Sequence, residues 1–355
     1  MAWPALVLTA GARMNLAKRK GLIARTPESE RPPAGPLRFP PRLASEPVSR
    51  FRPFEDRWEP GFLRLPLASA SRPLSWVVDS MGIYYDATAP SELEMLLERG
   101  GWESDELMAE AEAGIAALRQ SGLSLDNDPR RRDLGRLLDA AEDLDLGPGG
   151  KVVVVVDQPI ADQTVGFSLA GAGRFGAMLE YARAENPDAM IVVVTDPAGP
   201  AVAEAGHLLR RPLPEGVFPV YEPVTSRSII DRADRLYTVC THLGFEAALA
   251  GIPVVCFGIA FYSGWGFTDD RLVASRRTRR RSALEVFAAA YLHYSRYYDP
   301  KTGGMIGFAD ALALLKDEVA ASRTATTARS RNRGSIGLER LGIFRSGLRH
   351  LLPKN

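Results

Sequence analysis

The chain has little cysteine, no long apolar run and almost no net charge. Its 355 residues include two cysteines, Cys240 and Cys256, both within or beside apolar segments. Such positions favour reduced thiols in a core over a disulfide or a catalytic role, which suits a cytoplasmic protein. The net charge of +1 gives no basis for nucleic-acid binding, and a composition of 46% hydrophobic and 25% charged residues is that of a folded protein.

No segment reaches the roughly 18 consecutive apolar residues that a membrane-spanning helix needs. The mildly apolar start, Trp3 to Ala12, lacks the basic stretch that precedes the apolar part of a signal peptide. We therefore expect neither a membrane span nor a secretion signal. No short-period repeat is present either.

Breaks in composition divide the chain into four parts, and its length favours two domains at about 150 residues each. Residues 1–53 form an irregular arm, rich in proline and arginine, with an expected first strand at Ala5–Thr9 and a short helix. An N-terminal domain is expected at 54–147. The sequence Leu-Gly-Pro-Gly-Gly at 146–150 marks the boundary of a C-terminal domain at 148–320. A basic, partly disordered tail occupies 321–355.

The C-terminal domain alternates strands and helices. Lys151–Val156 is a continuous β-branched run, typical of a parallel strand covered on both faces. Further elements are expected as helices at 174–185, 226–233 and 241–250 and strands at 190–194, 236–239 and 254–257. This alternation predicts a doubly wound parallel sheet in an α/β protein.

The N-terminal domain is less regular. Strands are expected at 62–65, 76–78 and 83–85, and helices begin at Ser91 and at Ser104, where capping residues precede apolar positions at helical spacing.

Thr241 and His242 open a short helix between two buried strands. Free amides at a helix N-terminus, together with a threonine hydroxyl, form a site for phosphate. Glu246, within the first turns, can accept hydrogen bonds from ribose hydroxyls, and the glycine-hinged aromatic loop 261–266 lies beside the next strand end. These features predict a nucleotide site at the carboxyl ends of the strands.

The loop Asp157–Asp162 follows the strongest strand, where reactive groups of open α/β sheets lie. A catalytic carboxylate is one interpretation of this loop. An ordinary turn is the other, because Asp and Pro are common in turns.

The segment 241–271, THLGFEAALAGIPVVCFGIAFYSGWGFTDDR, resembles the signature GFEALLAG-P-V-CFG-PFYAGWGLTDDR of the bacterial capsular polysaccharide β-Kdo transferases, the KpsC-like family. The similarity continues through the arginines of 276–281 and Tyr297-Tyr298-Asp299-Pro300, and upstream through 59–64, 73–79 and 82–86. The resemblance implies a GT-B-like fold with two Rossmann-like domains facing a cleft, the N-terminal domain 54–147 on the acceptor side and the C-terminal domain 148–320 binding the nucleotide sugar. It also implies a retaining glycosyltransferase that takes Kdo from CMP-Kdo.

Catalytic roles follow from the same resemblance. The family's Q-x-x-x-D motif maps to Gln158 and Asp162, with the aspartate as nucleophile of a double displacement. Glu59 matches the glutamate expected to act as general base, although by composition it belongs to an acidic surface run. Arg64 is expected to bind the sugar carboxylate, or else to be a solvated charge at a strand end.

The full set of residues expected to bind substrate is larger. It comprises Gln158, Arg64, Asp196, Pro197, Thr241, His242, Gly244, Glu246, Gly258, Tyr262, Trp265 and Arg271. We expect no metal and no cofactor besides the donor substrate, because Asp269 and Asp270 before Arg271 are typical of a salt-bridged turn. The arginines of 276–281 either face an anionic substrate or form a solvated face.

Two departures from the family pattern bear on activity. The family's K-x-H-P-D is Val194-Thr195-Asp196-Pro197 here, without lysine or histidine, and S-K-Y-N is Ser124-Leu125-Asp126-Asn127. An ionised aspartate about 4 Å from a phosphate would repel it by about 4 kcal/mol at an effective dielectric of about 20. The alternative function is therefore a degenerate, non-catalytic capsule-assembly subunit of the same fold.

The tail, 323–355, is strongly basic. Its first half lacks periodic apolar residues and is expected to be disordered, whereas its second half can form a basic amphipathic helix. Such a helix would place the protein at the inner face of the membrane, near a lipid-linked oligosaccharide acceptor and other capsule-assembly proteins. A tail that only solubilises the chain is the competing interpretation.

Overall fold

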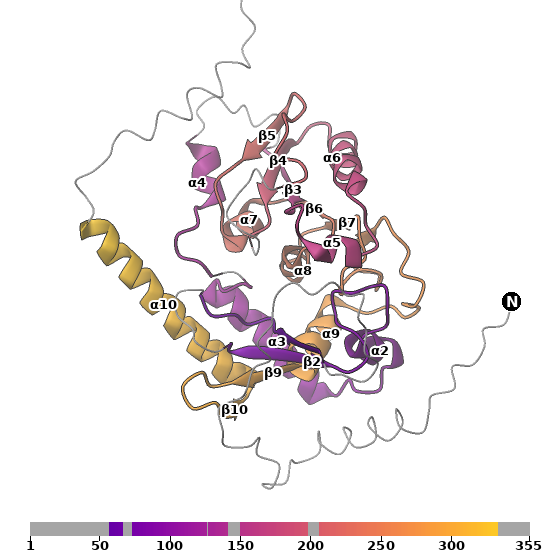
Figure 1. Cartoon of the computed structure of the whole chain (residues 1–355), viewed down its shortest axis with the longest axis vertical. Coiled ribbons are helices and arrows are strands. Elements are labelled where there is room, and N and C mark those ends of the chain that lie inside the picture. The colour runs from indigo at the N-terminus through magenta and orange to yellow at the C-terminus, as the bar shows by residue number, and fades with distance from the viewer. Residues whose placement is uncertain (1–56, 67–72, 126, 141–149, 198–205, 333–355) are drawn as a thin grey trace, which may run out of the picture. The chain divides into compact units, whose positions relative to one another are not determined.

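The computed structural model describes residues 57–66, 73–125, 127–140, 150–197 and 206–332, which build two sheets and their helices (Figure 1). The expected first strand at 5–9, the boundary near residue 147, Asp126 and the second half of the tail lie outside the described residues.

The larger sheet has six strands with neighbours paired in parallel, in the order β5-β4-β3-β6-β7-β8. Its strands are β3 Val152–Asp157, β4 Met190–Thr195, β5 Val217–Val220, β6 Arg235–Thr238, β7 Val254–Cys256 and β8 Asp269–Asp270. The chain runs outward from β3 to β5 and then returns to place β6 on the other side of β3. The crevice beyond β3 and β6 is therefore the switch point at which open α/β sheets bind ligands.

The apolar run of β3 is explained by burial on both faces. Val152, Val154 and Val156 lie in one hydrophobic core, while Val153 and Val155 lie in another on the opposite face. Because successive side chains of a strand alternate between faces, a strand covered on both sides needs a continuous apolar sequence.

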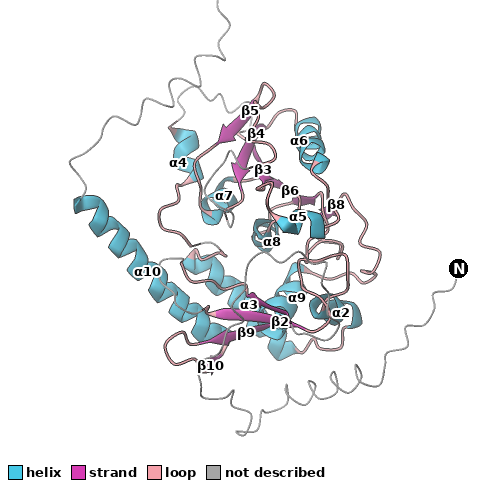
Figure 2. Ribbon diagram, in the orientation of Figure 1, coloured by secondary structure: helices cyan, strands magenta, loops and turns pink. Residues whose placement is uncertain are grey.

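Helices cover both faces of this sheet (Figure 2). They are α5 Gln163–Phe167, α6 Gly173–Glu185, α7 Ser226–Arg232 and α8 His242–Leu249. The α6 helix buries Phe175, Met178 and Leu179 in the core with Val153, and α7 and α8 contribute Ile229 and Phe245 to the other core. The α/β alternation expected from the sequence is confirmed.

The smaller sheet is antiparallel, in the order β1-β2-β9-β10. Its strands are β1 Arg57–Pro60, β2 Ser75–Asp79, β9 Ser295–Tyr298 and β10 Met305–Ile306. The described residues thus contain one Rossmann-like sheet, and the expectation of a second is not met among them. β1 and β2 pair antiparallel, as do β2 with β9 and β9 with β10, whereas a Rossmann-like sheet is built from parallel neighbours.

Two strand predictions in this half are wrong. Residues 62–65 leave the ladder because the Ser75 hydroxyl accepts from the Leu63 amide (3.1 Å) and donates to the Leu63 carbonyl (2.6 Å). Residues 83–85 form turns, since the Asp79 carboxylate accepts from the amides of Met81 and Gly82, each at 2.8 Å. Side-chain oxygens replace strand partners at both places.

The helices of this half begin at the predicted caps, Ser91 and Ser104, whose side chains accept from the amides of Glu94 and Leu107. These helices are α2 Glu92–Arg99 and α3 Asp105–Ser121, followed by α4 Leu134–Asp139, α9 Ala283–Phe287 with its π-helical continuation η3 Ala288–Tyr294, and α10 Phe308–Asn332. Residues 323–332 were expected to be disordered, but they continue α10. Among the helices described, none is both long and apolar enough to cross a membrane.

One hydrophobic core joins the two sheets. Phe62 from the smaller half lies 4.9 Å, ring centre to ring centre, from Tyr291 of η3 and 5.3 Å from Phe261 beyond β7. Phe261 in turn contacts Phe245 of α8 at 5.1 Å. This shared aromatic packing fixes the walls of the cavity at the switch point.

Candidate active site

A cavity of about 370 Å³ lies at the carboxyl edge of the parallel sheet. It is lined by Arg64, Tyr84, Tyr85, Leu125, Gln158, Pro159, Ala161, Asp162, Thr164, Asp196, Cys240, Thr241, His242, Ala260 and Phe261. The loops after β3, β4, β6 and β7 supply one wall, and residues of the smaller half supply the other. Six of the predicted site residues therefore meet at the switch point.

Asp162 is held by side chains on both of its carboxylate oxygens. As the N-cap of α5, its Oδ1 accepts from the Thr164 amide (2.9 Å) and hydroxyl (2.7 Å). Its Oδ2 accepts from the Gln158 amide nitrogen at 2.9 Å, and Gln158 Oε1 accepts from the Cys240 amide at 3.3 Å. The two interpretations of this loop are compatible, because the same carboxylate caps a turn of helix and lines the cavity.

Thr241 lies at the N-terminus of α8 but does not cap it. Its hydroxyl pairs with that of Thr238 at 2.8 Å, and its amide donates to the same Thr238 oxygen at 3.1 Å. Thr241 thus stands at the N-cap position, where the helix was expected to open, but its side chain makes no capping hydrogen bond. The start of α8 still faces the cavity with its positive dipole end, which favours an anion there.

His242 lies within the aromatic cluster. Its ring stacks on Phe62 and Phe261 at 5.3 and 5.6 Å, and Nε2 lies 2.9 Å from the Tyr291 hydroxyl. Burial, reinforced by the Arg64 charge, lowers the pKa of His242 to about 3. The imidazole is therefore neutral at physiological pH and meets a ligand as a hydrogen-bonding group rather than a cation.

Arg64 and Glu59 come from β1 and the turn that follows it. Arg64 donates from Nε to the Gly61 carbonyl (2.9 Å) and from Nη2 to the Pro60 carbonyl (3.3 Å), which fixes the guanidinium at the cavity wall. Glu59 does not line the cavity, and its Oε1 accepts from the Tyr85 hydroxyl at 3.0 Å. Burial raises the pKa of Glu59, the direction that suits a proton-accepting group.

The acidic residues after β3 and β4 differ in role. The Asp157 carboxylate accepts from the amides of His207, Leu208 and Leu209 at 2.9–3.0 Å, so it shapes a loop. Asp196 lines the cavity, and its amide donates to the Asp157 carbonyl at 2.8 Å. Pro197, the next residue, is buried without lining the cavity. The chain thus presents the Asp196 carboxylate to the cavity, at the position that the resemblance matches to a histidine.

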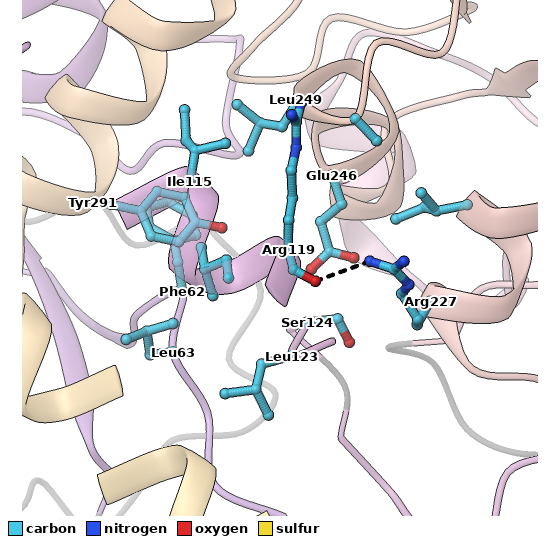
Figure 3. A pocket seen from close by; sticks show the side chains of 13 residues that line it. Phe62, Leu63, Ile115, Arg119, Leu123, Ser124, Arg227, Glu246, Leu249 and Tyr291 are labelled. Carbon is cyan, nitrogen blue, oxygen red and sulfur yellow. Dashed lines mark hydrogen bonds between the residues drawn. The ribbon is translucent and has the colours of Figure 1, made fainter. Parts of the chain in front are cut away.

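Glu246 lies elsewhere than expected. It lines a smaller cavity of about 60 Å³ between α3, α7 and α8, and its Oε1 accepts from the Leu125 amide at 2.6 Å. Figure 3 shows it beside Arg227, whose guanidinium donates to the Arg119 carbonyl (3.1 Å). Glu246 therefore does not line the larger cavity, and its contact with a ribose stays a prediction.

The remaining predicted residues lie around the cavity without lining it. The Tyr262 hydroxyl donates to the Thr241 carbonyl (2.7 Å), and a Cβ on Gly244 would lie 2.1 Å from that hydroxyl. Trp265 donates to the Phe261 carbonyl at 2.9 Å, and Gly258 leaves room for Ser168. These residues support the wall that Thr241 and Phe261 present.

Arg271 lies away from the cavity. Its guanidinium donates to Glu185 at 2.6 Å and to Asp269 at 3.0 Å, so the expected salt bridge is present. Asp269 and Asp270 form β8 rather than a turn. Among the described residues, no group of three or more His, Cys, Asp and Glu side chains is placed to hold a metal ion.

The arginine run 276–281 was expected either to face an anionic substrate or to form a solvated face, and neither interpretation fits its buried members. Arg277 and Arg281 have side chains only 3% and 6% exposed and pair with Glu94 and Glu103. These ion pairs connect α2 and the residue before the N-cap of α3 to the loop beyond β8. Arg277 and Arg281 therefore have a structural role.

Sequence reasoning missed several cavity residues, among them Tyr84, Tyr85, Thr164 and Cys240. The segment 82–86 matched the family, and its two adjacent tyrosines were the available signal. Both cysteines are free, as expected, with Cys256 buried and Cys240 half-buried.

A Rossmann-like sheet, a second α/β half and a cavity at the switch point define a GT-B-like fold, the architecture of many nucleotide-sugar-dependent transferases. The sequence model of the family described as capsule polysaccharide biosynthesis protein matches residues 131–297. Two solved structures from Thermosulfurimonas dismutans are similar. KpsC, β-Kdo 2,4-transferase, is 39% identical with a TM-score of 0.64, covering 73% of this chain and 78% of that chain. KpsC, β-Kdo 2,7-transferase, is 30% identical with a TM-score of 0.55, covering 74% and 77%.

Proteins related in sequence also have names that refer to capsule polysaccharide or lipopolysaccharide. The capsule polysaccharide modification protein LipA of Neisseria meningitidis serogroup B is 35% identical over 271 residues, 73% of this chain. The lipopolysaccharide-processing protein LpsZ of Rhizobium meliloti is 34% identical over 248 residues, 68% of this chain and 54% of LpsZ. The matched region spans only 37% of the length of LipA. This chain belongs to the KpsC-like family of capsule polysaccharide biosynthesis proteins.

Proposed function

We propose that the protein is a retaining glycosyltransferase that transfers Kdo from CMP-Kdo to a lipid-linked Kdo acceptor during capsule polysaccharide assembly. The observation that carries this proposal is the convergence of Asp162, Thr241 and Arg64 on one cavity. It is supported by the 39% identity to a solved Kdo transferase of the same fold.

The roles follow from the chemistry of each group. The N-terminus of α8 would receive the donor phosphate, and Arg64 the sugar carboxylate. Asp162 would attack the anomeric carbon as CMP leaves, forming a glycosyl-enzyme ester, and the acceptor hydroxyl would then displace Asp162. Two inversions retain the configuration. Glu59 would serve as the base for the acceptor.

The second candidate is a non-catalytic capsule-assembly subunit, and Asp196 is the observation that favours it. This carboxylate lines the cavity in place of the histidine of the family motif. A repulsion of about 4 kcal/mol against a phosphate at about 4 Å would weaken donor binding roughly a thousandfold. The two candidates therefore differ first in whether CMP binds.

Thermal unfolding with CMP separates them. A ligand that binds only the native state stabilises it by about 2.7 kcal/mol at a hundred times its Kd. Transferase function predicts a rise in Tm with CMP or CMP-Kdo, which Asp196→His should increase. An unchanged Tm at millimolar CMP would favour the subunit.

Asp162→Asn tests the chemical step. Asparagine caps helices as well as aspartate does, so α5 should be retained, whereas the nucleophilic carboxylate is lost. We expect transfer to disappear, CMP binding to stay near the wild-type level, and wild-type enzyme to carry Kdo on the Asp162 peptide in mass spectrometry. Asp188→Asn, at an exposed position, is the control. An active Asp162→Asn enzyme would contradict the assignment of Asp162 as the nucleophile.

Localisation at the inner face of the membrane, with other capsule-assembly proteins, is a further part of this proposal. Residues 333–355 carry Arg333, Arg340, Arg345, Arg349 and Lys354 against Glu339. Each basic residue near an anionic surface contributes about 1 kcal/mol. Binding of this segment to the membrane would bring the protein close to a lipid-linked acceptor.

A further inference from the structure

Tyr85 connects Glu59 to the cavity. The cavity is lined by Tyr85 and not by Glu59, and the Tyr85 hydroxyl donates to Glu59 Oε1 at 3.0 Å. Among the described residues this is the one hydrogen bond that either side chain forms. A molecule in the cavity can therefore contact the Tyr85 hydroxyl, whereas the Glu59 carboxylate lies behind it.

The register of the smaller sheet places this pair. Glu59 in β1 stands opposite Val77 of β2, which is fully buried, so both side chains lie on the inner face of the sheet. Tyr85 comes from the turn beyond β2, where its ring contacts Tyr84 at 5.2 Å and Phe167 at 5.9 Å. The phenol is thus fixed by packing from both halves.

The charges around the pair suit proton transfer. Burial raises the pKa of Glu59, opposed by the hydrogen bond from Tyr85 and by the charges of Arg64 and Arg57. Burial and the neighbouring Glu59 carboxylate raise the pKa of Tyr85, with a smaller contribution from Tyr84 in the same direction. Because the pKa of Tyr85 is raised, the phenol keeps its proton at neutral pH and donates a hydrogen bond to Glu59 Oε1.

We propose that Tyr85 is a catalytic residue that relays the acceptor's proton to Glu59, an inference that rests on the proposed transferase function. As the acceptor oxygen bonds to the anomeric carbon, the ester bond to Asp162 breaks and frees its carboxylate. The acceptor proton passes to the Tyr85 oxygen while the phenolic proton passes to Glu59 Oε1. Glu59 later returns the proton through Tyr85 to water.

The relay serves only the second displacement. Formation of the glycosyl-enzyme ester releases CMP and removes no proton from an incoming hydroxyl. Discharge of the ester by the acceptor does remove one. Loss of Tyr85 should therefore separate the two half-reactions.

The experiment is Tyr85→Phe, followed by rapid-quench mass spectrometry of the Asp162 peptide with CMP-Kdo and a synthetic Kdo glycoside as acceptor. We expect the ester to form at the wild-type rate and its discharge to slow about 100-fold, the usual range of general base catalysis. Glu59→Gln should show the same defect, and the double variant should be no slower than Glu59→Gln because the two act as a unit. Tyr221→Phe, at an exposed tyrosine, is the matched control.

A pH profile distinguishes a relay from a packing role. Without the phenol's hydrogen bond to the charged carboxylate, the pKa of Glu59 should rise, moving the acidic limb of the discharge rate upward by about one pH unit. In the wild-type enzyme, discharge in mixtures of H₂O and D₂O should show two protons in motion. This second measurement holds even if Tyr85→Phe folds poorly.

The possible negative results distinguish failure of the relay from failure of the transferase mechanism. Discharge at the wild-type rate in Tyr85→Phe, or a one-proton isotope dependence in the wild type, overturns the relay and leaves the transferase function intact. Absence of a Kdo ester on wild-type Asp162 overturns the transferase mechanism and the relay together.

Discussion

The Glu94–Arg277 ion pair is the strongest test of the packing between the two halves. Arg277 Nη2 lies 3.2 Å from Glu94 Oε2, with side chains 3% and 6% exposed. The same guanidinium donates to the carbonyls of Ala260 (2.5 Å) and Ser263 and lies over the Trp265 ring at 5.2 Å. Because Ala260 lines the cavity, this pair ties helix α2 to the cavity wall.

Glu94→Gln keeps the shape of the side chain and removes its charge. An uncompensated buried guanidinium destabilises a protein by about 3–5 kcal/mol. Total stabilities are about 5–15 kcal/mol, so the loss is a large fraction. At roughly 2–4 °C per kcal/mol, Tm should fall by about 10 °C. Arg276, which also donates to Glu94, is 35% exposed and can turn to water, so it adds little to the loss.

Urea unfolding monitored by circular dichroism measures the change. Glu180→Gln removes a surface pair, Glu180 with Arg183 at side-chain exposures of 65% and 38%, and should change stability by less than about 1 kcal/mol. Glu94→Leu combined with Arg277→Met should recover most of the loss, since a packed apolar pair can replace a buried ion pair. The reasoning is refuted if Glu94→Gln is as stable as Glu180→Gln.

Three further perturbations have defined outcomes. The pKa of His242 is lowered from 6.5 to about 3, so the unfolded chain binds a proton below pH 6.5 that the folded chain excludes until about pH 3. The stabilising effect of the neutral imidazole is present above pH 6.5 and is lost as pH falls towards 3, at about 1.4 kcal/mol per pH unit. Urea unfolding from pH 7 to 4 should show this extra fall in the free energy of unfolding in the wild type and not in His242→Phe. Equal pH slopes in the two proteins would contradict the prediction. Gly244→Ala should destabilise by about 1–3 kcal/mol or more, because its Cβ would meet the Tyr262 hydroxyl at 2.1 Å. Gly176→Ala in α6, with nothing within 4 Å, should instead stabilise by about 0.5–1 kcal/mol, and the same direction for both would count against the packing argument. Truncation after Asn332 should reduce sedimentation with anionic liposomes at low salt while preserving the fold, and equal sedimentation of both forms would argue against membrane binding by the tail.

Much of the site could be placed from the sequence because it belongs to loops that follow recognisable strands. The run at 152–156 predicts β3, and the loop after it then carries Gln158 and Asp162 to the same edge as Thr241. The parallel pairing of β3 with β6 brings the two loops together, as expected of a switch point.

Errors arose where a side chain's direction or partner depends on distant residues. Glu246 follows Thr241 by five residues, which on a helix of 3.6 residues per turn is a rotation of about 140°. Thr241 therefore lines the large cavity, while Glu246 lines the small cavity and binds the Leu125 amide, 121 positions away. Spacing along α8 showed that the two residues were close but not that they faced different cavities.

The sequence by itself determined the elements whose signals are local. The continuous valines of β3 and the capping serines 91 and 104 act within a few residues, through burial on both faces and through hydrogen bonds to nearby amides. Only the tertiary structure decided that Arg277 is a buried counterion of Glu94, 183 positions away, rather than a surface charge, and that Tyr85 meets Glu59. Residue type sets what a side chain can bind, whereas burial and distance to a partner come from the packing of segments far apart in the chain.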